Sequence, residues 1–491
     1  LGSLLAVPPD YRAYFQLLEH MRPSVILVAE ELSRRYVNKP LPLGDAEDAF
    51  FHEVVLLWLK TAKAYAHCAE SIPPGSSRAE DLAVLLHRRI HFTGMAILEH
   101  HRVRREMPWG LWHDLHGHYK SAEEMRLATL EIPDIFEERA DKTHCAAVYL
   151  AFILCDMAGS YGLSWRAQKL VRRWASAWSP LIGLHPVTVG EALPSFVIDL
   201  TQDIALRPSS ECLHTAPIRR LDTARLADRV SRVRQQLRQR IPPSEIGLGD
   251  DCTPQQCTQL LGHLARQWSQ ARAARKFRRH ATSGTVQVCT SFEEMYYFVS
   301  GHEFQPPEDT RGFGRGGFDE VFSLRFQDGP RQPRQEEPAA SYDTDAWEMV
   351  DHSANGFRLI RNADGRKMAH GQLLALRPRD SERFLLAQVT WLMQENSGGL
   401  IAGLRALPGL PRAVGARPVG SPGGPKKKYQ RAFLMPALNT GDSEQSLVLP
   451  AGWIRPGLLI EISDDGVWRA KLKKVLDSGP DFERVSLESP S

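Results

Sequence analysis

The stretch Val350-Asp-His-Ser-Ala-Asn-Gly-Phe-Arg-Leu359 concentrates the most informative chemistry of this sequence. Asp351 carries a carboxylate that only accepts hydrogen bonds, and Ser353 adds a hydroxyl that both donates and accepts. Gly356 follows and suits a backbone that takes positive φ or that a ligand approaches closely. The apolar residues after Gly356 predict the start of a strand. We therefore expect a polar turn that leads into a strand.

A basic cluster, Arg275-Lys-Phe-Arg278-Arg279-His280, lies upstream, just before a predicted strand at Thr285–Thr290. Arginine presents a planar fork of donors that pairs with phosphate or with guanine O6 and N7. The carboxylate of Asp351 accepts hydrogen bonds from the N–H groups of guanine. An alternative stays open: the arginines end a solvated basic helix, and Asp-His-Ser is a capped turn.

Together the two clusters read R-x-x-x-R followed by D-x-S-x-x-G, which resembles the signature of PilZ domains, the bacterial receptors for cyclic di-GMP. The resemblance covers roughly residues 272 to 410. Within it, Gly371–Leu376 is similar to the family's glycine-led strand. Phe384–Leu392 and Gly398–Gly403 are similar to its closing hairpin. The resemblance implies a six-stranded antiparallel barrel with the arginines on a segment that folds around the ligand.

The resemblance also implies a ligand site. Arg275 and Arg279 would hold phosphates and guanine, and Arg278 is an additional candidate. Asp351 and Ser353 would contact guanine, while Gly356 would leave room for it. The gap between Arg279 and Asp351 is longer than is usual in the family, because a loop rich in Gly, Pro and Arg is inserted at 305–345.

At 491 residues the chain is expected to hold two to four domains. The periodicity of its apolar residues and the positions of its turn residues predict an α+β multidomain protein. The expected parts are an all-helical domain over 1–270, a PilZ-like β-barrel over 271–410, a linker over 411–428 and a small β-domain over 429–491. In the last of these, Asp465-Gly466 is typical of a hairpin turn. A helix that opens at Thr253-Pro254 is expected to run toward the Arg275 cluster.

A net charge of +3 predicts no strong electrostatic attraction of the whole chain to nucleic acid or to a membrane surface. The longest apolar run, Cys145–Cys155, is too short to cross a bilayer, and we expect a cytoplasmic protein. Seven cysteines are scattered along the chain, and only Cys252 and Cys257 lie close together. Their spacing matches neither a zinc nor a redox motif, so free thiols are expected.

Two other functions stay open. One is a metal-dependent phosphohydrolase, because residues 87–118 hold seven of the eighteen histidines and the pair His113-Asp114. These histidines are His87, His91, His100, His101, His113, His116 and His118. A partly exposed helix and loop rich in histidine explains the same pattern, and we predict no metal site.

The other alternative function is nucleic-acid binding, suggested by the arginines between 219 and 279. The near-neutral charge of the chain argues against nucleic acid as a partner. Gly312-x-Gly314-x-x-Gly317 has the glycine spacing of a dinucleotide-binding fingerprint. That fingerprint requires a strand before the glycines, and no strand is predicted there, so we reject a dinucleotide site.

The prediction is therefore a cyclic di-GMP effector without catalytic activity or a further cofactor. Binding at the barrel would be relayed to the helical domain and from there to an unidentified protein partner.

Overall fold

The structure is a computed structural model of the chain. It describes residues 2–73, 75, 78–136, 142–188, 191, 194–212, 217–269, 280–307, 342–353, 355–419, 427–437, 444–453, 455 and 457–488. The chain forms two compact units. The first contains residues 1–278, 362–370 and 391–402, and the second contains residues 279–361, 371–390 and 403–491. Nearly all helices belong to the first unit, and two β-barrels account for most of the second.

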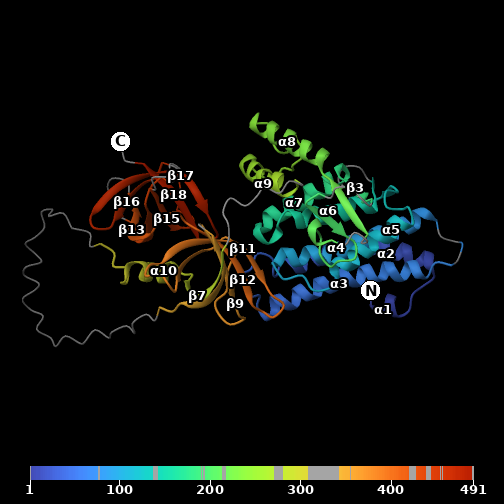
Figure 1. Cartoon of the computed structure of the whole chain (residues 1–491), viewed down its shortest axis with the longest axis horizontal. Helices are drawn as coiled ribbons and strands as arrows, with labels where there is room; N and C mark the ends of the chain where they lie inside the picture. Colours follow the sequence, from blue (N-terminus) through green and yellow to red (C-terminus); the bar gives the residue numbers. More distant parts are fainter. Residues whose placement is uncertain are drawn as a thin grey trace, which may run out of the picture. The chain divides into compact units, whose positions relative to one another are not determined.

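The first unit is built mainly of helices around one apolar core (Figure 1). Among the described residues these are α1 (Gly2–Ala6), α2 (Tyr11–Ser33), α3 (Asp45–Glu70), α4 (Ala79–Val103), α5 (Leu111–Glu124), α6 (Cys145–Met157), α7 (Trp165–Trp178), α8 (Ala224–Arg238) and α9 (Pro254–Gln267). Trp58, Trp174 and Trp178 are among the largest side chains in the core. The predicted helical character of this region is confirmed. No described helix is long and apolar enough to cross a membrane.

Helix α9 begins where the sequence predicted. The Thr253 hydroxyl accepts from Gln256 N–H at 3.3 Å, and the Gln256 amide oxygen accepts from Thr253 N–H at 3.0 Å. This reciprocal pair is a capping box, and Pro254 needs no hydrogen bond at the first helical position. The helix ends at Gln267 and does not run into the Arg275 cluster. Trp268 is the C-cap residue, and its buried indole donates to the Leu154 carbonyl at 2.9 Å.

The region predicted as all-helical also contains short strands. A two-stranded sheet pairs β1 (Ile132–Pro133) with β2 (Lys142–Thr143). A four-stranded sheet has the order β3-β6-β4-β5, from β3 (Gly183–Pro186), β4 (Phe196–Asp199), β5 (Arg207–Pro208) and β6 (Ile218–Asp222). The all-helical prediction was wrong here. These strands are two to five residues long, too short for the alternation that identifies a strand in sequence.

Gly94 allows α4 and α6 to approach closely. A Cβ atom at this position would lie 2.1 to 2.4 Å from ring atoms of Phe152. We expect Gly94→Ala to lower the free energy of unfolding by about 1–3 kcal/mol, since overpacking forces neighbouring groups apart. Gly117→Ala in α5, where nothing lies within 4 Å, is the matched control and should stabilise by up to about 1 kcal/mol. Urea unfolding followed by helical circular dichroism measures both; equal effects would contradict the packing argument.

The first barrel closes in the strand order β10-β11-β12-β9-β8-β7. Its strands are β7 (His280–Cys289), β8 (Asp345–Ser353), β9 (Gly356–Arg361), β10 (Leu373–Pro378), β11 (Leu385–Gln394) and β12 (Leu400–Ala406). The pairs β10–β11, β10–β7, β7–β8 and β8–β9 are antiparallel. This is the six-stranded barrel that the PilZ resemblance implied. Most of the inserted loop predicted at 305–345 lies outside the described residues.

The second barrel includes a strand that the sequence suggested was a linker. It closes in the order β13-β14-β15-β18-β17-β16. The strands are β13 (Arg412–Pro418), β14 (Gln430–Met435), β15 (Ser446–Pro450), β16 (Leu459–Ser463), β17 (Val467–Ser478) and β18 (Phe482–Glu488). β13 lies within the predicted linker 411–428, because its Gly415 and Pro418 resemble linker composition. Packing favours glycine at position 415, since a Cβ there would lie 3.3 Å from the Phe304 ring.

The two barrels share one apolar cluster within the second unit. Helix α10 (Phe292–Ser300; labelled in Figure 1) contacts β13 and β14. Its Met295 and Tyr296 share the cluster with Phe433 of the second barrel. A polar contact adds to this packing, because the Asp481 carboxylate accepts from Leu373 N–H at 3.0 Å. The barrels therefore form one body rather than two independent domains.

Asp481 makes the second unit sensitive to pH. Burial raises its pKa to about 6, although the hydrogen bond from Leu373 N–H opposes this shift. The folded state therefore binds a proton more tightly than the unfolded state, and stability falls as pH rises from about 4 through 6. We expect Asp481→Asn to stabilise the unit at pH 7.5 by about 1 kcal/mol and to have little effect at pH 4.5. Thermal unfolding at both pH values tests this, with exposed Asp465→Asn as control.

Two loops of the first barrel belong to the first unit. Residues 362–370 join β9 to β10, and residues 391–402 contain the β11–β12 hairpin. Within the first unit, Leu41 and Met368 exchange backbone hydrogen bonds of 2.8 and 2.7 Å. Gln394 N–H donates to the Arg104 carbonyl, and Glu106 N–H donates to the Gln394 carbonyl, both at 2.8 Å. The barrel strands thus continue directly into contacts with helical segments.

Candidate functional site

The D-x-S-x-x-G residues lie where β8 turns into β9. Ser353 and Gly356 are register partners at the end of this hairpin, and the Ser353 hydroxyl lies 3.5 Å from the Gly356 carbonyl oxygen. Asp351, Ser353 and Gly356 are all partly exposed. A Cβ at position 356 would lie 3.1 Å from the Leu404 carbonyl oxygen of β12. Glycine is therefore favoured there by a close backbone approach.

The strand register brings the start of β7 beside this hairpin. Ala281 of β7 pairs with Asp351 of β8, and His280 pairs with His352. In the sequence, Arg279 directly precedes His280, the first residue of β7. The strand that follows the basic cluster therefore pairs with the strand that carries Asp351, although about seventy residues separate Arg279 and Asp351 in sequence.

Arg275, Arg278 and Arg279 themselves lie outside the described residues. The register pairs β7, which follows this cluster in the sequence, with β8, which carries Asp351.

Arg358 is a candidate that the sequence reading did not single out. It is the register partner of Asp351 across the β8–β9 pair, next to an irregularity between Met349 and Asp351. Cross-strand partners share one face of a sheet, so a guanidinium belongs to the same face as the Asp351 carboxylate. The signal available in sequence was its position two residues after Gly356 in a tight hairpin.

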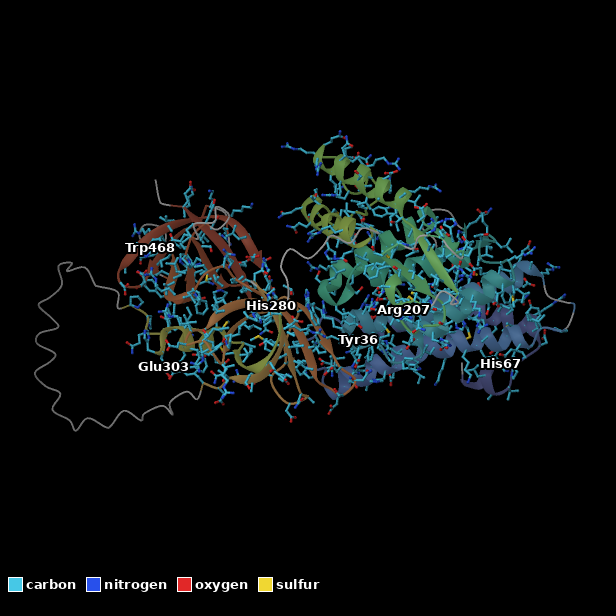
Figure 2. All side chains as sticks on the ribbon, in the orientation of Figure 1. Tyr36, His67, Arg207, His280, Glu303 and Trp468 are labelled. Atoms are coloured by element: carbon cyan, nitrogen blue, oxygen red, sulfur yellow. The ribbon has the colours of Figure 1, made fainter. Side chains whose placement is uncertain are left out.

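Two imidazoles flank the same end of the barrel. His280, labelled in Figure 2, is exposed, and its ring centroid lies 5.9 Å from that of His352. Nδ1 of His352 is buried and has no hydrogen-bond partner among the described residues. The end of the barrel thus combines a carboxylate, a hydroxyl, a guanidinium and imidazoles.

The histidines at 87–118 do not converge in this way. His87 and His100 are buried in the helical core, and burial lowers their pKa, for His100 to about 4. His116 has both ring nitrogens in hydrogen bonds, with the Tyr149 hydroxyl at 2.8 Å and the Ile204 carbonyl at 2.9 Å. His113 and Asp114 are exposed. Among the described residues, no three His, Cys, Asp or Glu side chains gather to hold a metal ion.

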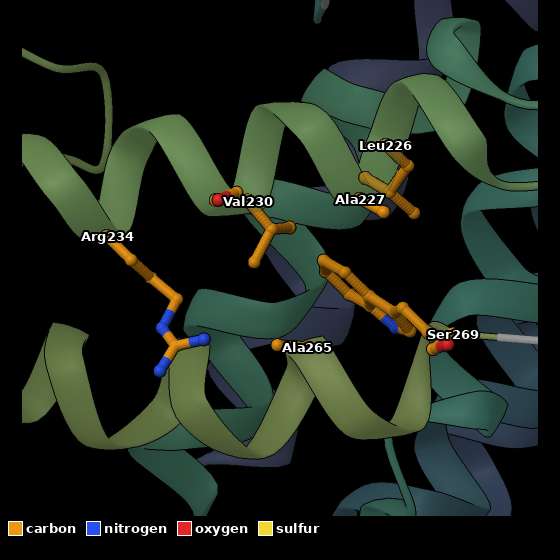
Figure 3. A pocket seen from close by; sticks show the side chains of 8 residues that line it. Leu226, Ala227, Val230, Arg234, Ala265 and Ser269 are labelled. Atoms are coloured by element: carbon orange, nitrogen blue, oxygen red, sulfur yellow. The ribbon is translucent and has the colours of Figure 1, made fainter. Parts of the chain in front are cut away.

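A small cavity lies elsewhere, between α8 and α9 (Figure 3). Leu226 and Val230 line it from α8, Ala265 lines it from α9, and Arg234 closes one end. Its volume of about 70 Å³ is far below the roughly 300–1,000 Å³ of typical ligand pockets. It is too small for a dinucleotide.

Comparison with known proteins covers most of the chain. The family model described as "Cyclic-di-GMP receptor FimW, N-terminal domain" matches residues 1–188, and the "middle PilZ domain" model of the same receptor matches residues 195–308. The "FimW C-terminal beta-barrel domain" model matches residues 414–489. The chain belongs to the FimW family.

A relative supports the same assignment. The "Cyclic-di-GMP receptor FimW" of Pseudomonas aeruginosa is 23% identical over 507 residues, which cover 94% of this chain and 81% of that protein. The FimW family is one of receptors, which act as effectors rather than enzymes. The resemblance to PilZ domains is therefore confirmed, and the helical half belongs to the same family rather than to an unrelated module.

The match to the FimW middle domain covers only part of the candidate site. It includes the Arg275–Arg279 cluster and β7 but ends at residue 308, before β8 begins. Asp351, Ser353 and Gly356 therefore rest on the geometry of the β7–β8–β9 sheet. The roles of individual residues remain predictions.

Proposed function

We propose that this chain is a cytoplasmic receptor for cyclic di-GMP that binds the ligand at the end of the first barrel. The observation that supports the proposal is the pairing of Asp351 in the D-x-S-x-x-G hairpin with Ala281, which follows the R-x-x-x-R motif by two residues in the sequence. Membership of the FimW family supports the identity of the ligand.

Each proposed ligand contact follows from the chemistry of its side chain. Arg275 and Arg279 pair with the phosphates and with guanine O6 and N7, and Arg278 assists them. Asp351 accepts from the N1–H and N2–H groups of a guanine, which a carboxylate satisfies with two oxygens. Ser353 donates to a phosphate or carbonyl oxygen, and Gly356 leaves its side of the hairpin open.

Arg358 is proposed to support this set. Placed across from Asp351, its guanidinium orients the carboxylate or reaches a phosphate itself. We expect Arg358→Ala to weaken cyclic di-GMP binding about 10-fold, roughly 1.4 kcal/mol. Arg358→Lys keeps the charge but lacks the planar fork, and an intermediate loss is expected. Fluorescence titration with a labelled ligand measures both, and unchanged affinity in Arg358→Ala would exclude this role.

We further propose that ligand binding is relayed to the helical region and to a protein partner. Two features support this relay. The Arg275–Arg279 cluster follows α9 in the chain, and β11 ends in the first unit, where Gln394 exchanges backbone hydrogen bonds with Arg104 and Glu106. A ligand shifts an equilibrium only when it binds two states unequally. The relay therefore requires two arrangements of the segment between α9 and β7.

Calorimetric titration of cyclic di-GMP into the full chain tests the receptor function, with GTP as the control ligand. Saturable binding that GTP does not reproduce is expected. A folded chain that binds neither ligand, or both equally, would overturn the proposal. The relay has a separate test: hydrogen exchange of α9 and of residues 391–402 with and without ligand. Unchanged exchange at saturating ligand would reject the relay while leaving binding intact.

A further inference from the structure

Cys252 and Cys257 occupy two special positions around the start of α9. Thr253 is the N-cap, so Cys252 lies one residue before the cap and Cys257 is the fourth residue of the helix. Side chains at these two positions often meet and fix the angle at which the chain enters a helix. The Thr253–Gln256 capping box holds the intervening backbone. Local sequence thus brings two thiols together that no familiar redox spacing relates.

Each thiol is also held from outside the turn. Cys257 is fully buried in the helical core. On the other side, Arg173 forms two hydrogen bonds with the carboxylate of Asp251, the neighbour of Cys252, at 2.6 and 2.7 Å. Arg173 also donates to the Leu248 carbonyl at 3.2 Å, and the Trp174 indole donates to the same oxygen at 3.1 Å. The loop that carries Cys252 is therefore tied to α7.

The two sulfur atoms lie 2.8 Å apart. Packed apolar atoms usually stay about 3.5–4.0 Å apart, whereas a disulfide bond measures about 2.05 Å. The Sγ–Sγ distance is therefore shorter than an ordinary packing contact and longer than a disulfide bond. Cys252 is half-buried, so a small reagent reaches this thiol before the fully buried Cys257.

We infer that Cys252 and Cys257 are a redox-active dithiol that a peroxide converts to an intramolecular disulfide at the start of α9. The inference does not depend on cyclic di-GMP binding. Oxidation would covalently attach the 247–252 loop to α9, the last described helix before the basic cluster.

The reaction balances with hydrogen peroxide as the oxidant. The Cys252 thiolate attacks one peroxide oxygen; an S–O bond forms, the O–O bond breaks, and the released hydroxide becomes water on taking a proton. The sulfur of Cys257 then attacks the sulfenic acid of Cys252; the S–S bond forms, the S–O bond breaks, and a second water leaves. Two thiols have lost two electrons and two protons, and one peroxide has become two waters. Burial raises the pKa of Cys257, so its attack as a thiolate is favoured by alkaline pH.

The test is a count of free thiols and peptide mass spectrometry on the full chain at pH 8, before and after hydrogen peroxide. We expect two of the seven thiols to disappear, a crosslinked peptide containing Cys252 and Cys257, and full recovery with dithiothreitol. Cys252→Ser should abolish the crosslink. Cys212→Ser is the matched control, because Cys212 is also half-buried but its sulfur contacts the Pro208 carbonyl rather than a second sulfur. It should leave the crosslink intact.

Several results would overturn the inference. One is a wild-type chain in which peroxide leaves all seven thiols reactive. Another is oxidation of Cys252 to sulfinic acid without a crosslink, which would mean that the two residues only pack together. A disulfide between two chains, visible as a dimer on a non-reducing gel, would likewise exclude the intramolecular bond. Circular dichroism of Cys252→Ser establishes that its result does not come from misfolding.

Discussion

Asp351→Ala and Arg279→Ala are each expected to lower the affinity for cyclic di-GMP by 100-fold or more. Asp351 is proposed to accept two hydrogen bonds from guanine, and Arg279 to pair with phosphate or with guanine O6 and N7. Hydrogen bonds to charged groups contribute about 1.5–3 kcal/mol each, and leaving the partner group unpaired adds to the loss. A loss of about 3 kcal/mol corresponds to about 100-fold. Calorimetric titration of the full-length variants measures it.

Matched controls separate this effect from a general change of charge. Asp364→Ala removes an exposed carboxylate from the loop after β9, at the opposite end of that strand from the Ser353–Gly356 hairpin. Arg232→Ala removes an exposed arginine from the basic face of α8. Both should bind cyclic di-GMP as the unmodified chain does. If Arg232→Ala weakened binding as much as Arg279→Ala, the arginines would act as a diffuse basic surface, and the specific site would be rejected.

Asp134→Ala is expected to destabilise the first unit by about 3–5 kcal/mol, because two buried guanidinium groups lose their buried counter-charge and keep only the partly exposed Glu19. The Asp134 carboxylate accepts from Arg22 at 2.9 Å and from Arg88 at 2.7 Å, and all three residues are at least 95% buried. Arg88 also pairs with Glu19 at 3.0 Å, and Glu19 accepts from the Tyr65 hydroxyl at 2.7 Å. The network joins α2, α3 and α4 to the segment after β1.

Urea unfolding followed at 222 nm measures this loss, since most helices lie in the first unit. The control is Glu31→Ala, which breaks the exposed Arg34–Glu31 pair on α2 and should cost less than about 1 kcal/mol. Replacing Arg22, Arg88 and Asp134 together by apolar residues should cost less than Asp134→Ala alone, because the charge that loses its partners is then Glu19, whose side chain is 27% exposed, and not two buried guanidinium groups. A milder effect in Asp134→Ala than in the triple variant would refute the role of unpaired charge.

The same network predicts sensitivity to acid. Burial by itself would raise the pKa of Asp134, but the charges of Arg88 and Arg22 outweigh it, so the pKa is lowered. The pKa of Glu19 is lowered in the same way, mainly by Arg88 against the effect of burial. The unfolded state then binds these protons more readily than the folded state. The stabilisation is complete above about pH 5 and is lost as pH falls through 4 and below.

Much of the fold could be predicted because its signals are local. The capping box at Thr253, the apolar run at Cys145–Cys155 and the hairpin at Asp465-Gly466 each specify their element within a few residues. The sheet β3-β6-β4-β5 and strand β13 could not be predicted in this way. Their strands become regular only by pairing with distant partners, as β13 does with β14 and β16. Linker-like composition at Gly415 hides a packing preference set by Phe304.

The candidate site shows the same division. The sequence contains residue types that bind guanine and phosphate at Arg275, Arg279, Asp351 and Ser353. Arg358 was missed, because its relation to Asp351 exists only across the β8–β9 pair. The contact between Cys252 and Cys257 was missed for a different reason: it depends on their places around the Thr253 cap, and their spacing matches no familiar redox motif.

The sequence by itself thus determined the chemistry of the proposed ligand site, the order of helical and β regions and the capped ends of individual helices. These properties depend on side-chain type and on neighbours within one or two turns. Only the tertiary structure decided which strand pairs with which, that the last strands close into a second barrel, and that Ala281 lies opposite Asp351. The physical reason is that strand register is set by packing and hydrogen bonding between segments far apart in the chain, and no local pattern encodes it.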